Sequence, residues 1–143
     1  MTVETGTVPD TFPKLLLHHA HERPGRPAIR EKAYGIWQAW TWGEMRGEVE
    51  RLAAGLSEAG LARGAHIAVI GANRPRLYWT LTAAQCLGAI PVPFYEDAIA
   101  QEMVYVFQDA EIAFAVVEDQ EQADKLLEIL PQCPKLKHIW FDD

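Results

Sequence analysis

Two short runs of uninterrupted apolar residues constrain the fold of this chain more than any other feature. The first is Ile67–Ile70 and the second is Ile112–Val117. A strand with one solvated face alternates apolar and polar residues, whereas a strand covered on both faces is apolar throughout. Both runs therefore predict buried strands of a parallel sheet that has helices on both faces.

Helical patterns and further extended runs alternate with these two strands. The resulting order is β-α-β-α-β-α-β, which is typical of a parallel sheet built with right-handed crossovers. Pro91 and Pro93 each lack a backbone donor, so the run that contains them is not expected to be a regular central strand. The predicted helices cover residues 74–87, 99–110 and 120–130, and the other extended runs cover 90–95 and 137–141.

A helix, a β-hairpin and a second helix are predicted ahead of the sheet. The first helix covers residues 11–22, and the hairpin covers 28–42 with a Gly-bearing turn. Thr41 and Glu44 form a capping box, in which the Thr41 hydroxyl accepts from a backbone N–H of the helix and Glu44 reaches back. The helix opened by this box carries one apolar stripe and is expected to end at Gly60.

The charge of the chain excludes some classes of partner. The 20 acidic side chains outnumber the 13 basic ones, and the formal net charge is −7. A mildly acidic surface argues against nucleic acid as the main partner and against electrostatic adhesion to anionic lipid. No apolar run approaches the roughly 20 residues that span a bilayer, so a cytoplasmic protein is expected.

Cysteine usage favours a reducing compartment. Cys86 lies in a mostly apolar run and is predicted to be a small buried hydrophobe, whereas Cys133 lies between two prolines in a predicted loop. Two isolated cysteines form neither a disulfide framework nor a zinc site.

Catalytic signatures are missing from the sequence, which contains no G-x-G-x-x-G, no G-x-x-x-x-G-K-[ST] and no G-x-S-x-G. His18, His19 and His21 cluster on the first helix, and His18 and His21 have a spacing that could hold a metal. No third ligand lies nearby, so a solvated helix face is the better interpretation. We therefore predict no catalytic, cofactor-binding or metal-ligating residue in this chain.

Polar residues follow the predicted strands and mark one edge of the sheet. Glu96-Asp97 and Glu118-Asp119 could be carboxylate pairs but are interpreted as caps of the helices that follow them. Asn73 is predicted to cap the helix whose first turn contains Pro75. Because ligands of open α/β sheets bind at the carboxyl ends of strands, these residues and Gly71-Ala72 mark where a site should be sought.

Five aromatic residues stand out in this short chain. They could line an acyl or nucleotide pocket, but packing in the core and the hairpin is the preferred interpretation. They are Trp37, Trp40, Trp42, Tyr78 and Trp79.

Several segments, taken in order, resemble core motifs of the AMP-binding (adenylate-forming) superfamily. Departures from the usual pattern are Ala65, where Asp is typical, and Arg76, where an acid is common. The resemblance covers residues 10–143 behind a flexible N-terminus at residues 1–9. The matching segments are Trp40–Met45 with the helix at 51–56, Gly64–Ile70, Asn73–Pro75 with Trp79, and Leu87–Pro93.

Within that superfamily the long-chain fatty-acid–CoA ligases are the most similar, through residues 115–127 and the tail at 136–139. The resemblance implies an N-terminal subdomain of the adenylate-forming fold, truncated before the ATP-binding loop. The implied parent reaction joins a fatty acid to ATP, giving acyl-adenylate and pyrophosphate, and the thiol of coenzyme A then displaces AMP. ATP, Mg²⁺ and coenzyme A are implied for that parent and none of them for this fragment.

Three further expectations follow from the resemblance. The fragment alone should be inactive, its partner should be the missing remainder of the same enzyme, and its uncovered apolar surface should favour self-association. Whether the parent docks on a membrane is left open. The alternatives are another carboxylic-acid activator of the superfamily or a stand-alone flavodoxin-like binding module such as a receiver domain.

Overall fold

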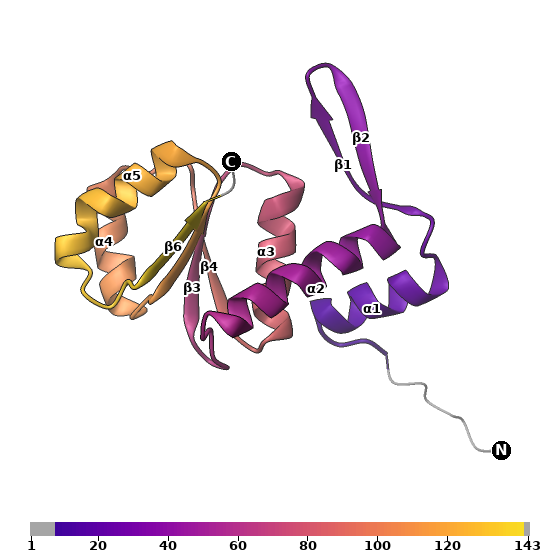
Figure 1. Cartoon of the computed structure of the whole chain (residues 1–143), viewed down its shortest axis with the longest axis horizontal. Coiled ribbons are helices and arrows are strands. Elements are labelled where there is room, and N and C mark those ends of the chain that lie inside the picture. The colour runs from indigo at the N-terminus through magenta and orange to yellow at the C-terminus, as the bar shows by residue number, and fades with distance from the viewer. Residues whose placement is uncertain (1–7, 142–143) are drawn as a thin grey trace.

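A parallel four-stranded sheet in the order β4-β3-β5-β6 forms the centre of the protein (Figure 1). The computed structural model describes residues 8–141, so most of the segment predicted to be flexible lies outside the described residues. The predicted α/β class and the parallel pairing of the strands are confirmed. The strands are β3 (His66–Ile70), β4 (Ile90–Phe94), β5 (Phe114–Val117) and β6 (His138–Phe141).

Helices cover both faces of the sheet (Figure 1). The side chains of β3 alternate between two cores, as the pleat of a strand requires. Ala68 and Ile70 pack with α4 and α5, whereas Ile67 packs with residues of α1, α2 and α3. The helices are α1 (Phe12–Glu22), α2 (Trp42–Glu58), α3 (Pro75–Cys86), α4 (Ala100–Asp109) and α5 (Gln120–Ile129), and a short 3₁₀ turn, η1 (Leu130–Gln132), follows α5.

The strand with the two prolines is an edge strand, in agreement with the expectation that it is not a regular central strand. The N–H of Ile90 donates to the carbonyl oxygen of Ala65 at 2.8 Å. The amide of Ile90 therefore points toward the neighbouring strand, β3. Successive residues of a strand point their amides in opposite directions. Pro91 and Pro93 therefore present their ring nitrogens to the open edge, where no donor is needed.

The predicted β-hairpin consists of β1 (Pro27–Ala33) and β2 (Ile36–Thr41), paired antiparallel, and it projects away from the helices (Figure 1). Its two turn residues, Tyr34 and Gly35, both have positive φ, at 51° and 79°. A two-residue turn with positive φ at both positions matches the right-handed twist of the flanking strands. Beside this turn, the register pairs Ala33 with Ile36 and Lys32 with Trp37, as a two-residue loop requires.

The predicted capping box at the start of α2 is confirmed. The Glu44 N–H donates to the Thr41 hydroxyl at 3.2 Å, and the Thr41 N–H donates to a Glu44 carboxylate oxygen at 2.8 Å. The Thr41 hydroxyl donates to the same carboxylate oxygen at 2.9 Å, and these two donors from Thr41, the N–H first, lower the pKa of the Glu44 carboxyl below its ordinary value. Gly60, with a φ of 95°, lies just beyond the end of α2, which confirms it as the C-terminal stop.

The prediction for Cys86 is wrong, because this side chain is exposed, whereas Cys133 is buried beside the 3₁₀ turn. Cys86 is two residues beyond the buried Ala84, which places it about 200° around the helix from the packed side. Composition of the run could not reveal this, since α3 is apolar on several sides. None of the helices within residues 8–141 combines the length and apolar character needed to cross a bilayer.

Removing the cap should destabilise the protein without altering its fold. We expect Thr41→Ala to lower the free energy of unfolding by about 1 kcal/mol, the usual cost of losing an N-cap. Ser57→Ala, an exposed substitution later in the same helix, serves as the control and should change it by less than about 0.5 kcal/mol. Urea titration followed by circular dichroism measures both, and equal effects would contradict the role of the cap.

The same box predicts a pH dependence. Because the pKa of Glu44 is lower in the folded chain than in the unfolded chain, its stabilising contribution is present above the unfolded pKa. The contribution is lost as the pH falls through the pKa that Glu44 has in the folded chain. Glu44→Gln should therefore flatten the acid limb of a plot of stability against pH, and an unchanged acid limb would contradict this origin.

Candidate functional site

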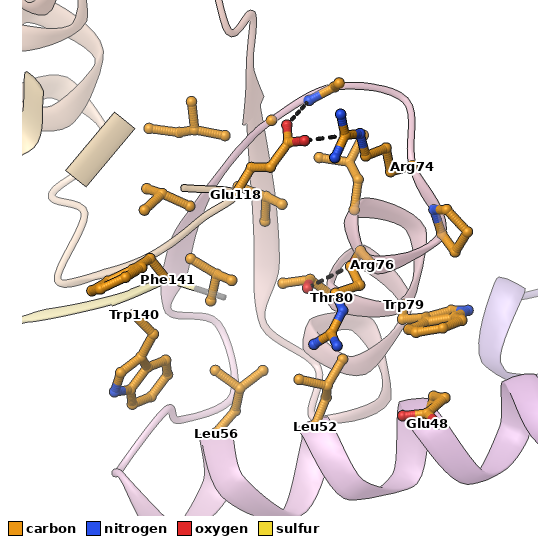
Figure 2. A pocket seen from close by; sticks show the side chains of 18 of the residues that line it. Glu48, Leu52, Leu56, Arg74, Arg76, Trp79, Thr80, Glu118, Trp140 and Phe141 are labelled. Atoms are coloured by element: carbon orange, nitrogen blue, oxygen red, sulfur yellow. Dashed lines mark hydrogen bonds and ion pairs between the residues drawn. The ribbon is translucent and has the colours of Figure 1, made fainter. Parts of the chain in front are cut away.

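A cavity of about 760 Å³ lies at the carboxyl ends of β3, β5 and β6, between α2 and α3 (Figure 2). This is the edge of the sheet at which the sequence predicts a site. The volume falls within the range of about 300–1,000 Å³ that is usual for ligand pockets. The position follows from the topology, because parallel strands bring all their carboxyl ends to one edge.

The lining of the cavity combines apolar and charged side chains, and Figure 2 shows the guanidinium of Arg76 between Thr80 and Leu52. Figure 2 shows Leu52 and Leu56 of α2 facing Trp140 and Phe141 of β6 across the opening. The rim carries three arginines and three glutamates, so the charges of the lining balance although the whole chain has a net charge of −7. The charged residues are Glu31, Glu48, Arg51, Arg74, Arg76 and Glu118.

Glu118 joins two of the strand-end loops. Its carboxylate accepts a hydrogen bond of 2.6 Å from the Ala72 N–H and lies 3.0 Å from the Nε of Arg74 (Figure 2). The Arg74 side chain is 61% exposed, so its ion pair contributes little. The Glu118 side chain is only 21% exposed, and its bond to the backbone is therefore the stronger part of the link.

Gly71 is required for this link. A Cβ atom added at Gly71 would lie 2.9 Å from the Cβ of Glu118, a distance that real Cβ contacts do not show. A carboxylate oxygen of Glu118 would lie 3.0 Å away as well, but the nearest atom is the base of the side chain, so rotation of that side chain cannot relieve the clash. The absence of a side chain at Gly71 lets β5 and the loop after β3 approach closely.

The predictions for the strand-end residues are confirmed in part. Asp119 caps α5 as predicted, because its carboxylate accepts from the Gln122 N–H at 3.0 Å. Glu118 does not cap this helix, since it turns back to Ala72. The sequence shows a carboxylate pair but not which member faces across the sheet, and that depends on the packing of β3 against β5.

Two predicted caps are wrong. The N-cap of α3 is Arg74 without a side-chain cap, and Asn73 instead accepts a hydrogen bond of 3.3 Å from the Tyr78 hydroxyl. Helix α4 begins at Ala100 with Ile99 as its N-cap and no side-chain cap, so Glu96 and Asp97 lie ahead of the cap position. The carbonyl oxygen of Glu96 accepts from Gln122 and Lys125 of α5, which ties the loop to the neighbouring helix instead.

The aromatic residues mostly pack, in agreement with the preferred interpretation. Trp40 and Trp79 contact edge to face with ring centroids 5.5 Å apart, and Trp42 contacts His19 at 4.6 Å. Tyr78 is partly exposed, and Trp37 is 67% exposed on the hairpin. Trp79 also lines the cavity, and its buried indole nitrogen has no hydrogen-bond partner among residues 8–141.

The histidine cluster has no arrangement suited to metal binding. His18 and His21 are exposed, and the Nδ1 of His19 lies 2.8 Å from a guanidinium nitrogen of Arg23. Partial burial, with smaller contributions from Arg23 and His18, lowers the pKa of His19. Within the described part of the chain, no three His, Cys, Asp or Glu side chains lie close enough together to hold a metal ion.

The cavity is thus an apolar surface with paired charges at its rim. Sequence reasoning located the correct sheet edge but missed Arg74 and Glu31, whose ion pair of 3.7 Å connects the hairpin to α3. No motif marks that contact, because it joins residues that are far apart in the chain. Chemically, the cavity can bind an apolar group or another polypeptide segment.

The close approach at Gly71 generates a stability prediction. Gly71→Ala should lower the free energy of unfolding by about 1–3 kcal/mol, the usual cost of overpacking. Gly55→Ala, on the α2 wall where an added Cβ meets nothing within 4 Å, is the matched control and should be neutral or stabilising by up to about 1 kcal/mol. Thermal denaturation compares the two. Because the clash is with a Cβ atom, Glu118→Ala should not rescue Gly71→Ala, and full rescue would contradict the explanation.

Comparison with known proteins agrees with this architecture. In sequence, the chain is 24% identical over 132 residues to the long-chain-fatty-acid–CoA ligase FadD15 of Mycobacterium bovis, which is 91% of this chain but 22% of that protein. It is also 34% identical over 93 residues to the protein Rv1549 of Mycobacterium tuberculosis, covering 65% of this chain and 53% of Rv1549. The similar segment therefore makes up very different shares of the two relatives.

Solved structures show the same fold. The N-terminal domain of FACL13 from Mycobacterium tuberculosis superimposes with a TM-score of 0.83 at 20% identity, over 92% of this chain and 33% of that domain. Acetoacetyl-CoA synthetase from Streptomyces lividans gives a TM-score of 0.82 at 23% identity, over 90% of this chain and 21% of that protein. Residues 16–143 match the AMP-binding enzyme family. The chain belongs to this family of adenylate-forming enzymes.

Proposed function

We propose that this chain is the N-terminal portion of an AMP-forming long-chain fatty-acid–CoA ligase and supplies scaffold to its catalytic lobe. The observation that carries the proposal is the family match over residues 16–143 in a chain that spans 22% of FadD15. In the parent reaction, a fatty acid and ATP give acyl-adenylate and pyrophosphate, and the thiol of coenzyme A then displaces AMP.

The two edges of the sheet support the role as a scaffold. The ring nitrogens of Pro91 and Pro93 blunt the outer edge of β4, so further strands cannot pair regularly there. The edge of β6 is open, and Phe141 at its carboxyl end is 48% exposed. The remainder of the lobe would extend the sheet beside β6 and cover the cavity next to it.

The described residues do not fit the charged groups that the reaction requires. Adenylation sets a carboxylate against a polyphosphate, so it needs cations and directed backbone donors. Arg74 already pairs with Glu118 and Glu31, and residues 8–141 contain no cluster suited to Mg²⁺. We accordingly assign the binding of ATP, Mg²⁺ and coenzyme A to the remainder of the enzyme.

The acid substrate has a second candidate, which comes from the solved structures. Anthranilate CoA ligase AuaEII shares the fold with a TM-score of 0.83 at 18% identity, so the fold itself accommodates other acids. The long-chain fatty-acid ligases are preferred because they recur among the sequence relatives, including FadD15 and the mouse ACSBG2. A receiver-type module has no such support, since the family match covers nearly the whole chain.

An activity assay tests whether this piece contains catalytic groups. We expect the 143-residue chain, incubated with ATP, palmitate and coenzyme A, to release no pyrophosphate above a blank. A longer chain from the same reading frame that includes a Ser/Thr/Gly-rich loop ending in Lys should release it. Turnover by the short chain would contradict the scaffold role, and a longer chain that activates benzoate but not palmitate would favour the second candidate.

A self-association assay tests whether the edge of β6 exposes an apolar surface that binds other molecules. The isolated chain should bind a hydrophobic dye and show concentration-dependent association in sedimentation velocity. Phe141→Ser should weaken both effects, whereas Tyr105→Ser, which removes a 72% exposed aromatic side chain from α4, should leave them unchanged. A strictly monomeric chain that binds no dye would contradict this expectation.

A further inference from the structure

The two edges of the β-hairpin differ in chemistry. Natural sheets protect an open edge with prolines, bulges or charged side chains. β1 has all three devices, namely Pro27, a register irregularity beside it, and the cations Arg30 and Lys32. β2 has none of them, because the run Ile36–Thr41 contains no charged residue, proline or glycine. The edge of β2 is therefore the unprotected edge of the hairpin.

The backbone of β2 directs hydrogen-bonding groups to this edge. Successive residues of a strand point their amides to opposite sides. The N–H of Trp42 donates to the carbonyl oxygen of Arg26 at 3.0 Å, so Trp42 and every second residue before it face β1. The N–H and C=O groups of Trp37 and Ala39 therefore point away from β1, to the side where the two-stranded sheet ends.

The side chains of β2 are exposed although several of them are apolar. Trp37 is 67% exposed and Ile36 is 68% exposed, and as neighbours in a strand they lie on opposite faces of the hairpin. A two-stranded hairpin is marginally stable by itself in water, and further strands beside it stabilise it. Both the backbone and the side chains of β2 thus suit pairing with another strand.

We propose that β2 pairs antiparallel with β2 of a second copy of this chain, about a two-fold axis that passes through Gln38. Opposed residues then share a face, because the two positions of each pair differ by an even number. The outward backbone groups of Trp37 and Ala39 bond between the copies. The register opposes Gln38 with itself, Trp37 with Ala39, and Ile36 with Trp40.

Shape and charge favour a second copy as the occupant of this edge. The large ring of Trp37 lies opposite the small Ala39 in both halves of the interface, so bulky side chains do not compete for space on that face. Two chains of net charge −7 repel each other, but β2 itself is uncharged. Antiparallel pairing also brings the tip of each hairpin, with Lys32 beside it, toward the start of α2 in the other copy, whose first turn carries Glu44.

The size of the interface sets the expected strength of the dimer. Stable interfaces bury about 1,200–2,000 Å² in total, and a strand of 6 residues supplies less, so the dimer should be reversible. The two bodies lie at opposite ends of the joined sheet, since each hairpin projects beyond its helices (Figure 1). A two-fold contact uses the same surface on both copies, so the assembly through the hairpin ends at two.

Sedimentation velocity tests the proposal on the 143-residue chain in a Phe141→Ser background, which weakens association through β6. We expect a concentration-dependent equilibrium between monomer and dimer, the dimer having twice the 16.1 kDa mass of the chain. Ala39→Lys should abolish the dimer, because it places a charge within the interface. Ser57→Lys adds the same charge at an exposed position of α2 and, as the matched control, should leave the dimer unchanged.

Two further variants test the backbone contact and the register. Ala39→Pro removes an outward N–H without removing a donor to β1, and it should also give monomers. Trp37→Ala should weaken the dimer. Trp37→Ala/Ala39→Trp should restore it, because the exchange again opposes one large and one small side chain in each pair.

Cross-linking gives an independent result. Gln38→Cys in a Cys86→Ser background should form a disulfide-linked dimer on copper-catalysed air oxidation, because opposed residues of a non-hydrogen-bonded pair lie close enough for a disulfide. Ile36→Cys in the same background is the control and should remain uncross-linked, because Ile36 does not lie opposite itself. Circular dichroism should show unchanged folding in each variant, since the altered hairpin positions lie outside the core.

Several outcomes would overturn the proposal. They are a Phe141→Ser chain that stays monomeric at every concentration, an Ala39→Lys variant that still dimerises, equal loss with Ser57→Lys, and no cross-link through Gln38→Cys. If a longer chain from the same reading frame is monomeric and protects the amides of Trp37 and Ala39 from hydrogen exchange, β2 pairs within that chain and the second copy is the wrong occupant.

The dimer and the proposed function are tested separately. The hairpin edge takes no part in the argument for the ligase, so a monomeric chain would leave the proposed function standing. Release of pyrophosphate by the short chain would contradict the scaffold role without affecting the dimer.

Discussion

β3 has no solvated face, and the arrangement of the other elements depends on that. Ile67 and Ala68 are both fully buried, although they belong to two different cores on opposite sides of the sheet. A strand of this kind needs helices above and below it, and parallel crossovers provide them. Once β3 lies in the middle, the carboxyl ends of its neighbours meet at one edge, which is where the cavity forms.

At that edge, a close approach of backbone stabilises the loops. Gly71 allows Glu118 to come near enough to accept from the Ala72 N–H at 2.6 Å. A partly buried carboxylate that accepts from a backbone amide is a stronger contact than an exposed ion pair. The link fixes the rim of the cavity, while the apolar floor formed with α2 and β6 stays open to a further segment or ligand.

The molecule thus presents two surfaces of different character. The open edge of β6 and the apolar cavity beside it suit the further chain that we propose completes the lobe, because β4 cannot extend the sheet on the other side. The hairpin exposes Trp37, Arg30 and Lys32 on one of its faces. It lies apart from the sheet, since it projects from the end of α2 that is remote from the sheet (Figure 1).

Local patterns in the sequence determined the order of elements, the hairpin and the capping box, because each depends on neighbours in the chain. The parallel sheet was inferred from that order, because strands that alternate with helices pair in parallel. The same holds for Asp119, whose bond to Gln122 spans three residues. The tertiary structure decided which strand-end residues face one another and which helix side is packed. Sequence alone therefore assigned Asn73, Glu96 and Cys86 wrongly and missed the pairing of Arg74 with Glu31 and Glu118. Such contacts join residues more than 40 positions apart, and only the packing of the sheet against α2 and α3 brings them together.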